Sequence, residues 1–198
     1  MLIGIRQLIA VLLLSSSQLM FAIEFTVVDQ HGKPLSDAVV ELLTEPVRTV
    51  AAQPAIMDQK HRRFAPRVLA IRKGRQVALP NSDNVRHHVY SFSPAKTFEI
   101  KLYKGVPGAP MKFDTAGLVT LGCNIHDGMI GYIYVAEHEH VGVSNESGTV
   151  SFDTTASSPT TLRYWHPDQL AAKEFNTMTS NGVQLSHIVT INVAGGDQ

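Results

Sequence analysis

The chain has 198 residues and no formal net charge, because 17 Lys and Arg balance 17 Asp and Glu. This balance argues against nucleic acid or an anionic membrane surface as a partner bound through overall charge. The length suffices for one sizeable β domain, or for a domain with an extension. The charges are nevertheless segregated: residues 60–86 hold eight Lys and Arg and one acid, whereas the residues after Met129 hold seven acids and two bases.

The first 22 residues have the layout of a secretory signal peptide. Arg6 precedes an apolar run from Leu8 to Leu14, and small and polar residues follow up to Ala22. The apolar run is too short to span a bilayer, which argues against stable membrane insertion. We therefore predict an exported, periplasmic protein whose signal peptide is residues 1–22.

The rest of the chain predicts a mainly β fold. Short apolar stretches recur between Gly, Pro, Asn and Asp, and no segment shows a long helical period. Residues 44–63 are less regular, with one helical turn expected near 56–61. We predict a domain over 23–140 and a β extension over 141–198. The expected strands lie in segments 23–43, 66–83, 86–93, 96–103, 116–123, 129–137, 148–154, 160–166 and 187–193.

The single cysteine, Cys123, has metal-binding neighbours. His126 follows three residues later, and Met129 three residues after that. A lone cysteine cannot form an internal disulfide, and a thiolate bound to a metal is protected in an oxidising compartment. A Cys with two His and a weak axial Met is the donor set of blue-copper sites. The second imidazole must come from elsewhere, and His87 and His88 are the adjacent candidates upstream.

Two motifs together resemble the cupredoxin family, in particular the plastocyanin–amicyanin group. The first resembles the family's N-x-D-x-x-x-H-N-V-like context and comprises Asn81, Asp83, His87 and Val89; the second has the short C-x2-H-x2-M spacing of amicyanin and comprises Cys123, His126 and Met129. The resemblance spans roughly residues 66–135. It implies a Greek-key β-sandwich that holds one type 1 copper ion through His87, Cys123, His126 and Met129. The sequence around His87 also resembles that of small exported proteins labelled methylamine utilisation proteins, a label that establishes no pathway.

Adjacent strand residues point to opposite faces, so His87 and His88 cannot easily both reach one ion. The alternation of side chains along the strand does not decide which of the two histidines is the ligand, because either face could be the buried one. The register of the family motif chooses His87. His88 then stands where the family usually has Asn, and we expect it to support the ligand loop by hydrogen bonding.

Other interpretations of these residues remain open. Zinc would prefer a closed tetrahedral set rich in Cys and His, in which methionine is an unusual ligand. A Cys–His pair could be a nucleophile and its base, although no oxyanion-stabilising motif accompanies it. His138 and His140 form an H-x-H pair that an exposed strand end explains equally well. Segments 26–42 and 141–168 resemble carboxypeptidase-regulatory-like β modules, which are non-catalytic, and we expect Trp165 and Tyr164 to pack that extension onto the copper domain.

The resulting hypothesis is a non-enzymatic electron carrier with one type 1 copper. Its partners would be redox proteins such as a periplasmic cytochrome or dehydrogenase. The basic stretch 60–86 is either a solvated face or a docking surface for an acidic redox partner. The alternatives are a copper delivery or sequestration protein that uses the same ligands, and a metal-free structural module in which Cys123 is buried.

Overall fold

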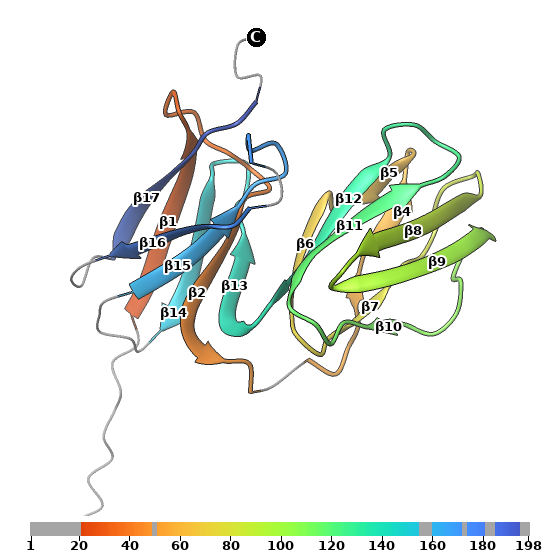
Figure 1. The fold of residues 1–198 in the computed structure, drawn as a ribbon, viewed down its shortest axis with the longest axis horizontal. Coiled ribbons are helices and arrows are strands. Elements are labelled where there is room, and N and C mark those ends of the chain that lie inside the picture. The colour runs from red at the N-terminus through yellow and green to blue at the C-terminus, as the bar shows by residue number, and fades with distance from the viewer. Residues whose placement is uncertain (1–20, 49–50, 155–159, 172–173, 181–184, 195–198) are drawn as a thin grey trace, which may run out of the picture.

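The computed structural model describes residues 21–48, 51–154, 160–171, 174–180 and 185–194. Within these ranges it consists of strands and turns without any helix, so the predicted mainly β fold is confirmed. No helix in these ranges is long and apolar enough to cross a membrane. All but the last two residues of the predicted signal peptide lie outside the described residues. Figure 1 shows the strands gathered into two bodies that lie side by side.

One body is a β-sandwich formed by residues 55–136, and we call it the inner sandwich because it lies in sequence between the strands of the other, outer body. A five-stranded sheet has the order β6-β12-β11-β8-β9, and a three-stranded sheet has the order β10-β7-β3. The strands β4 and β5 form a separate hairpin. The bounds are β3 (Ala55–Ile56), β4 (Asp58–Lys60), β5 (Arg63–Ala65), β6 (Val68–Arg72), β7 (Gln76–Ala78), β8 (His87–Ser93), β9 (Lys96–Tyr103), β10 (Met111–Lys112), β11 (Gly117–Cys123) and β12 (Ile130–Ala136).

The connection between the two inner sheets is of the Greek-key type. β8 and β9 form an antiparallel pair, after which the chain enters the small sheet as β10 and returns as β11 on the other side of β8. Apolar side chains from both sheets fill the space between them, among them Val77, Val89, Val119 and Ile133. The predicted Greek-key sandwich is therefore present. The helical turn expected near 56–61 is wrong, because β4 and a tight turn occupy those residues.

The outer body combines strands from the two ends of the chain. Its sheets have the orders β14-β1-β17 and β13-β2-β15-β16, and β1 pairs with β17 in parallel. The bounds are β1 (Phe21–Asp29), β2 (Val39–Pro46), β13 (His138–Val143), β14 (Thr149–Thr154), β15 (Thr160–Trp165), β16 (Asn176–Ser180) and β17 (Ser186–Ile191). The predicted boundary between 23–140 and 141–198 does not follow these sheets. β1 and β2 have the alternating pattern of any half-buried strand, and that pattern does not reveal which distant strand completes their sheet.

The two sandwiches share a small apolar interface. Trp165 is fully buried there with Val39, Val68, Tyr134 and Ala136, and its ring lies edge-on to Tyr132 with 5.1 Å between centroids. The expected packing onto the inner sandwich is confirmed for Trp165, whereas it is wrong for Tyr164, which packs against the core of the outer sandwich.

Charged groups reinforce this interface. Glu41 on β2 is fully buried, and its carboxylate accepts hydrogen bonds from the Tyr134 hydroxyl (2.5 Å) and from the backbone N–H groups of Glu137 (2.8 Å) and His138 (2.9 Å). Burial, with the Glu41 charge beside it, raises the pKa of Tyr134 far above its usual value. Because these bonds join β2 to the end of β12 and the start of β13, they tie the outer sandwich to the inner one.

Basic residues of segment 60–86 meet acidic residues that follow Met129 at the interface between the two sandwiches. Three ion pairs link the basic stretch to acids that follow it in the chain: Arg67–Asp168 (2.5 Å), Arg72–Glu139 (2.5 Å) and Lys73–Glu137 (3.8 Å). Their side chains are partly exposed, and such pairs typically contribute about 0–1 kcal/mol each. At least these three cations are therefore part of intramolecular pairs.

Candidate metal centre

The strand β8 directs His87 into the inner sandwich. His87, Val89 and Ser91 alternate along the buried face and are at most 1% exposed, whereas Phe92 on the opposite face is 79% exposed. The choice between the two histidines that the alternation left open is thus decided in favour of His87, whose imidazole is fully buried at the end of the sheet.

The loop between β11 and β12 carries the other candidate ligands. Cys123 ends β11, where its backbone pairs with Val89 of β8, and the backbone N–H of Asn124 donates to the carbonyl of His88 at 3.0 Å. A further turn hydrogen bond joins the N–H of Met129 to the carbonyl of His126 at 3.3 Å. The first bonds hold the start of the loop against β8 and the last one tightens the loop itself, so Cys123 and His126 face His87.

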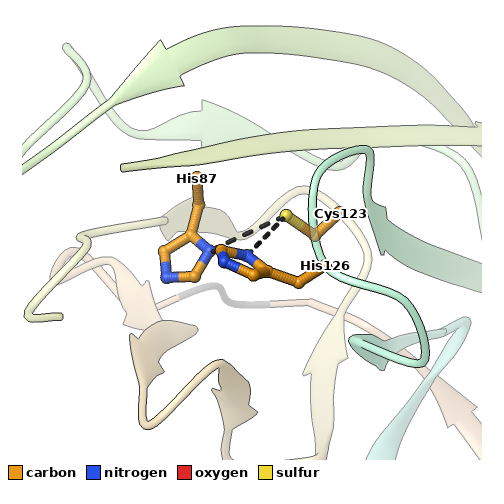
Figure 2. A group of neighbouring side chains, drawn as sticks. All are labelled: His87, Cys123 and His126. Atoms are coloured by element: carbon orange, nitrogen blue, oxygen red, sulfur yellow. Dashed lines mark hydrogen bonds between the residues drawn. The ribbon is translucent and has the colours of Figure 1, made fainter. Parts of the chain in front are cut away.

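The structure brings three donor atoms together (Figure 2). The Cys123 Sγ lies 3.7 Å from Nδ1 of His87 and 3.6 Å from Nδ1 of His126, and the two Nδ1 atoms are 3.1 Å apart. The point equidistant from all three lies about 2.0 Å from each, close to metal–nitrogen bonds (~2.0–2.1 Å) and slightly shorter than a metal–thiolate bond (~2.3 Å). Within the described residues this is the one group of three or more His, Cys, Asp or Glu side chains positioned to hold an ion. The donor set therefore fits a soft or borderline metal.

Met129 ends the same loop. It is 3% exposed and packs in the core of the inner sandwich, directly before β12 begins. Its burial places the thioether among apolar side chains on the inner side of the loop. The axial ligand role stays a prediction.

The residues of the upstream motif support His87 rather than the ion. Oδ2 of Asp83 lies 2.8 Å from Nε2 of His87, the ring nitrogen that does not contact Cys123. Asn81 donates to the carbonyls of Val85 (3.0 Å) and Tyr103 (2.8 Å) and accepts from the N–H of Asp83 (3.0 Å). The segment before β8 is thereby fixed, and a carboxylate is held against the candidate ligand.

The pKa of Asp83 is displaced by these surroundings. Partial burial raises it, but hydrogen bonds from the backbone N–H of Arg62, the His87 ring and the backbone N–H of His61 outweigh that effect and hold the pKa below its ordinary value. Asp83 is therefore ionised at neutral pH, with a negative charge directed at His87.

Three other histidines take no part in the cluster. Nε2 of His88 lies 2.8 Å from the Glu99 carboxylate, so the expected side-chain support of the loop is wrong and the backbone carbonyl of His88 provides it. Nδ1 of His138 contacts Glu41 at 2.9 Å, and the ring of His140 packs on Phe152. Neither H-x-H residue lies in a second cluster among the described residues.

Sequence reasoning missed an apolar groove beside the ligand loop. It has a volume of about 730 Å³ and lies on the outer face of β8 and β11, where the Tyr90 ring covers Gly122, the residue before Cys123. Its side-chain walls are chiefly apolar and include Tyr90, Phe92, Leu118, Ile130 and Phe175. The alternation of aromatic residues on the face opposite His87 is the signal that could have revealed it.

Comparisons with known proteins give the following likenesses. No protein-family model and no curated protein sequence matches the chain. An oxidised amicyanin variant matches with a TM-score of 0.38 and 17% identity, over 49% of this chain and 98% of the amicyanin. A copper-containing nitrite reductase from Thermus scotoductus SA-01 matches with a TM-score of 0.41 and 23% identity, over 57% of this chain and 28% of the reductase.

A purple cupredoxin from Nitrosopumilus maritimus matches with a TM-score of 0.34 and 22% identity, over 41% of this chain and 96% of the cupredoxin. Cupredoxins, the family that the two sequence motifs resemble, thus recur among the structural neighbours. At these identities the likeness concerns the fold alone.

Proposed function

We propose that this protein binds one type 1 copper ion and carries single electrons between redox partners in the periplasm. The observation that supports this most directly is the convergence of the Cys123 thiol with the imidazoles of His87 and His126, with donor separations of 3.1–3.7 Å. Two imidazoles and one thiolate are the equatorial set of blue-copper sites. Met129, at the end of the same loop, is the candidate for the weak axial ligand.

The chemistry of one-electron exchange comes from the bound copper, and the protein sets its position and potential. Cys123 and His87 are buried, and backbone hydrogen bonds fix both of their strands. A donor set held this firmly changes little between the two oxidation states, which favours fast transfer. His126 is the more exposed of the two candidate imidazole ligands, so an electron would enter or leave most directly at its edge.

Copper binding can be tested by titrating purified apoprotein with Cu(II) while recording the visible spectrum. A type 1 site gives an intense blue or green colour, with saturation at one ion per chain. Cys123→Ser is the control, because a serine oxygen cannot give the thiolate-to-copper charge transfer, and this variant should fold without the colour. A colourless wild-type titration, or an intensely coloured serine variant, would refute the assignment.

The alternative function is copper delivery or sequestration with the same ligands. It is favoured if the copper-loaded protein exchanges electrons slowly in stopped-flow mixing with a periplasmic cytochrome fraction. The carrier function predicts fast, reversible oxidation and reduction without loss of copper. Release of copper to a chelating acceptor during that exchange would instead support delivery.

A further inference from the structure

The hairpin of β4 and β5 has an unusual turn. Lys60 pairs with Arg63, and the two residues between them, His61 and Arg62, have positive φ angles of 53° and 56°. Two-residue hairpin turns with positive φ at both positions favour Asn-Gly, because residues with larger side chains are disfavoured there. Non-glycine residues in this region typically cost on the order of 1–3 kcal/mol each. Such a turn requires compensation from its surroundings.

The compensation comes from Asp83. Its Oδ1 accepts the backbone N–H of His61 at 2.6 Å, and its Oδ2 accepts the backbone N–H of Arg62 at 2.8 Å. Successive N–H groups in a left-handed turn form a concavity that binds anions. The same Oδ2 lies 2.8 Å from Nε2 of His87, and the Asp83 side chain is 10% exposed. One carboxylate therefore joins the turn to the buried imidazole.

The hairpin is itself anchored to the inner sandwich. Asp58 on β4 accepts hydrogen bonds from the hydroxyl (2.9 Å) and the backbone N–H (3.2 Å) of Ser82, next to Asp83. Phe64 on β5 is buried against Gly131 of β12, at a separation that leaves no room for a side chain on the glycine. The turn and its carboxylate thus have fixed positions relative to the sheet that carries the candidate ligands.

We propose that Asp83 is a positioning residue for the metal centre and that the β4–β5 turn holds it in place. Asp83 contacts Nε2 of His87, which leaves Nδ1 as the ring nitrogen that faces Cys123 and His126. A carboxylate bonded to a ligating histidine fixes the ring and increases its basicity, which favours Cu(II) over Cu(I). This role depends on copper binding as proposed above.

A matched pair of variants tests this role. Asp83→Asn and Glu99→Gln each remove one negative charge and alter one 2.8 Å contact to a histidine, but only Asp83 touches His87, whereas Glu99 touches His88. We expect Asp83→Asn to weaken Cu(II) binding, measured by chelator competition, by 10- to 100-fold, as is typical when a partner of a metal ligand is removed. With Cu(I) affinity unchanged, the potential rises by about 60 to 120 mV, at ~59 mV per tenfold. Glu99→Gln should change neither quantity by more than about twofold or ~20 mV.

The contact with the turn is testable without copper. In wild-type apoprotein the amide protons of His61 and Arg62 should exchange slowly with solvent although both residues are exposed, and Asp83→Asn should accelerate both. Arg62→Gly keeps the N–H group and should retain copper affinity and potential. Fast exchange of both amides in the wild type would overturn the proposed hold on Asp83.

The outcomes separate this role from the function on which it depends. Equal Cu(II) affinities and potentials for Asp83→Asn and Glu99→Gln, in a wild type that forms the coloured site, would refute the role of Asp83 alone. A wild type that binds no copper would refute the proposed function, and the role of Asp83 with it.

Discussion

Gly131 on β12 is a position where one added methyl group should strongly perturb the inner sandwich. A Cβ atom there would lie 2.6 Å from Cβ, 2.7 Å from Cγ and 2.8 Å from Cδ2 of Phe64. Phe64 is 4% exposed, and the obstructing atoms are at the base of its side chain, so they can move only if β5 moves. Overpacking of a core typically costs 1–3 kcal/mol. We expect Gly131→Ala to destabilise the protein by about 2–3 kcal/mol, at the upper end of that range.

Gly122 provides the matched control. A Cβ there would meet Cζ and the hydroxyl oxygen of Tyr90 at 2.7 and 2.8 Å, which are the far end of a partly exposed ring bordering the groove. Because the ring can turn away, and because alanine lowers the backbone entropy of the unfolded chain, the net cost of Gly122→Ala should be below about 1 kcal/mol.

Urea unfolding of the two apoproteins, followed by circular dichroism, compares their free energies of unfolding. Gly131→Ala should also lower copper affinity, since a displaced β5 moves the turn that holds Asp83. Equal free energies of unfolding for the two variants would show that Phe64 of β5 is not packed rigidly against β12. The proposed anchoring of the β4–β5 hairpin would then be wrong.

Three further predictions concern the ligands and one buried histidine. Met129→Leu should keep copper and colour but raise the potential, measured by redox titration, since loss of a weak axial donor favours Cu(I); complete loss of copper would mean that Met129 holds the metal strongly. His87→Ala should abolish the blue site or leave a position that added imidazole fills, whereas His88→Asn should retain it; the reverse result would place the ligand one residue later. Burial lowers the pKa of His166, whose Nδ1 accepts the N–H of Asp168. A lowered histidine pKa means that the unfolded state binds the proton first, so stability in urea should fall as pH drops below about 6.5, and His166→Gln should flatten this dependence.

Local patterns were sufficient for most of the longer strands, but they did not predict β3, β4, β5, β10, β13 or β16. The alternation along β8 narrowed the choice to two faces, and the motif register selected His87, which the structure places inside. The loop after β11 brings Cys123 and His126 together through short-range turns, and their spacing in the sequence reflects this directly.

Contacts between residues that are far apart in the sequence could not be predicted from local patterns. Strand β1 has no local feature that identifies β17 as its partner, and the family register assigned His88 a side-chain role that Glu99 alters by attracting the ring. The turn at His61 and Arg62 departs from the Asn-Gly preference of such turns, so its sequence did not predict a hairpin. Its conformation depends on Asp83, 21 and 22 residues further along the chain.

The arrangement of the two sandwiches has a consequence for the order in which the chain acquires its structure during synthesis. β1 and β2 are made first, yet the strands that cover their edges come last. The inner sandwich lies between them in sequence, and its ends meet where the N–H of Val47 donates to the carbonyl of Glu137 at 3.1 Å. Closing a loop of roughly 90 residues costs about 4 kcal/mol in chain entropy by the logarithmic law. Because the inner sandwich closes that loop as it folds, β13 begins beside β2 with His138 opposite Pro46, and the pairing continues with His140 opposite Leu42 after one shift in register.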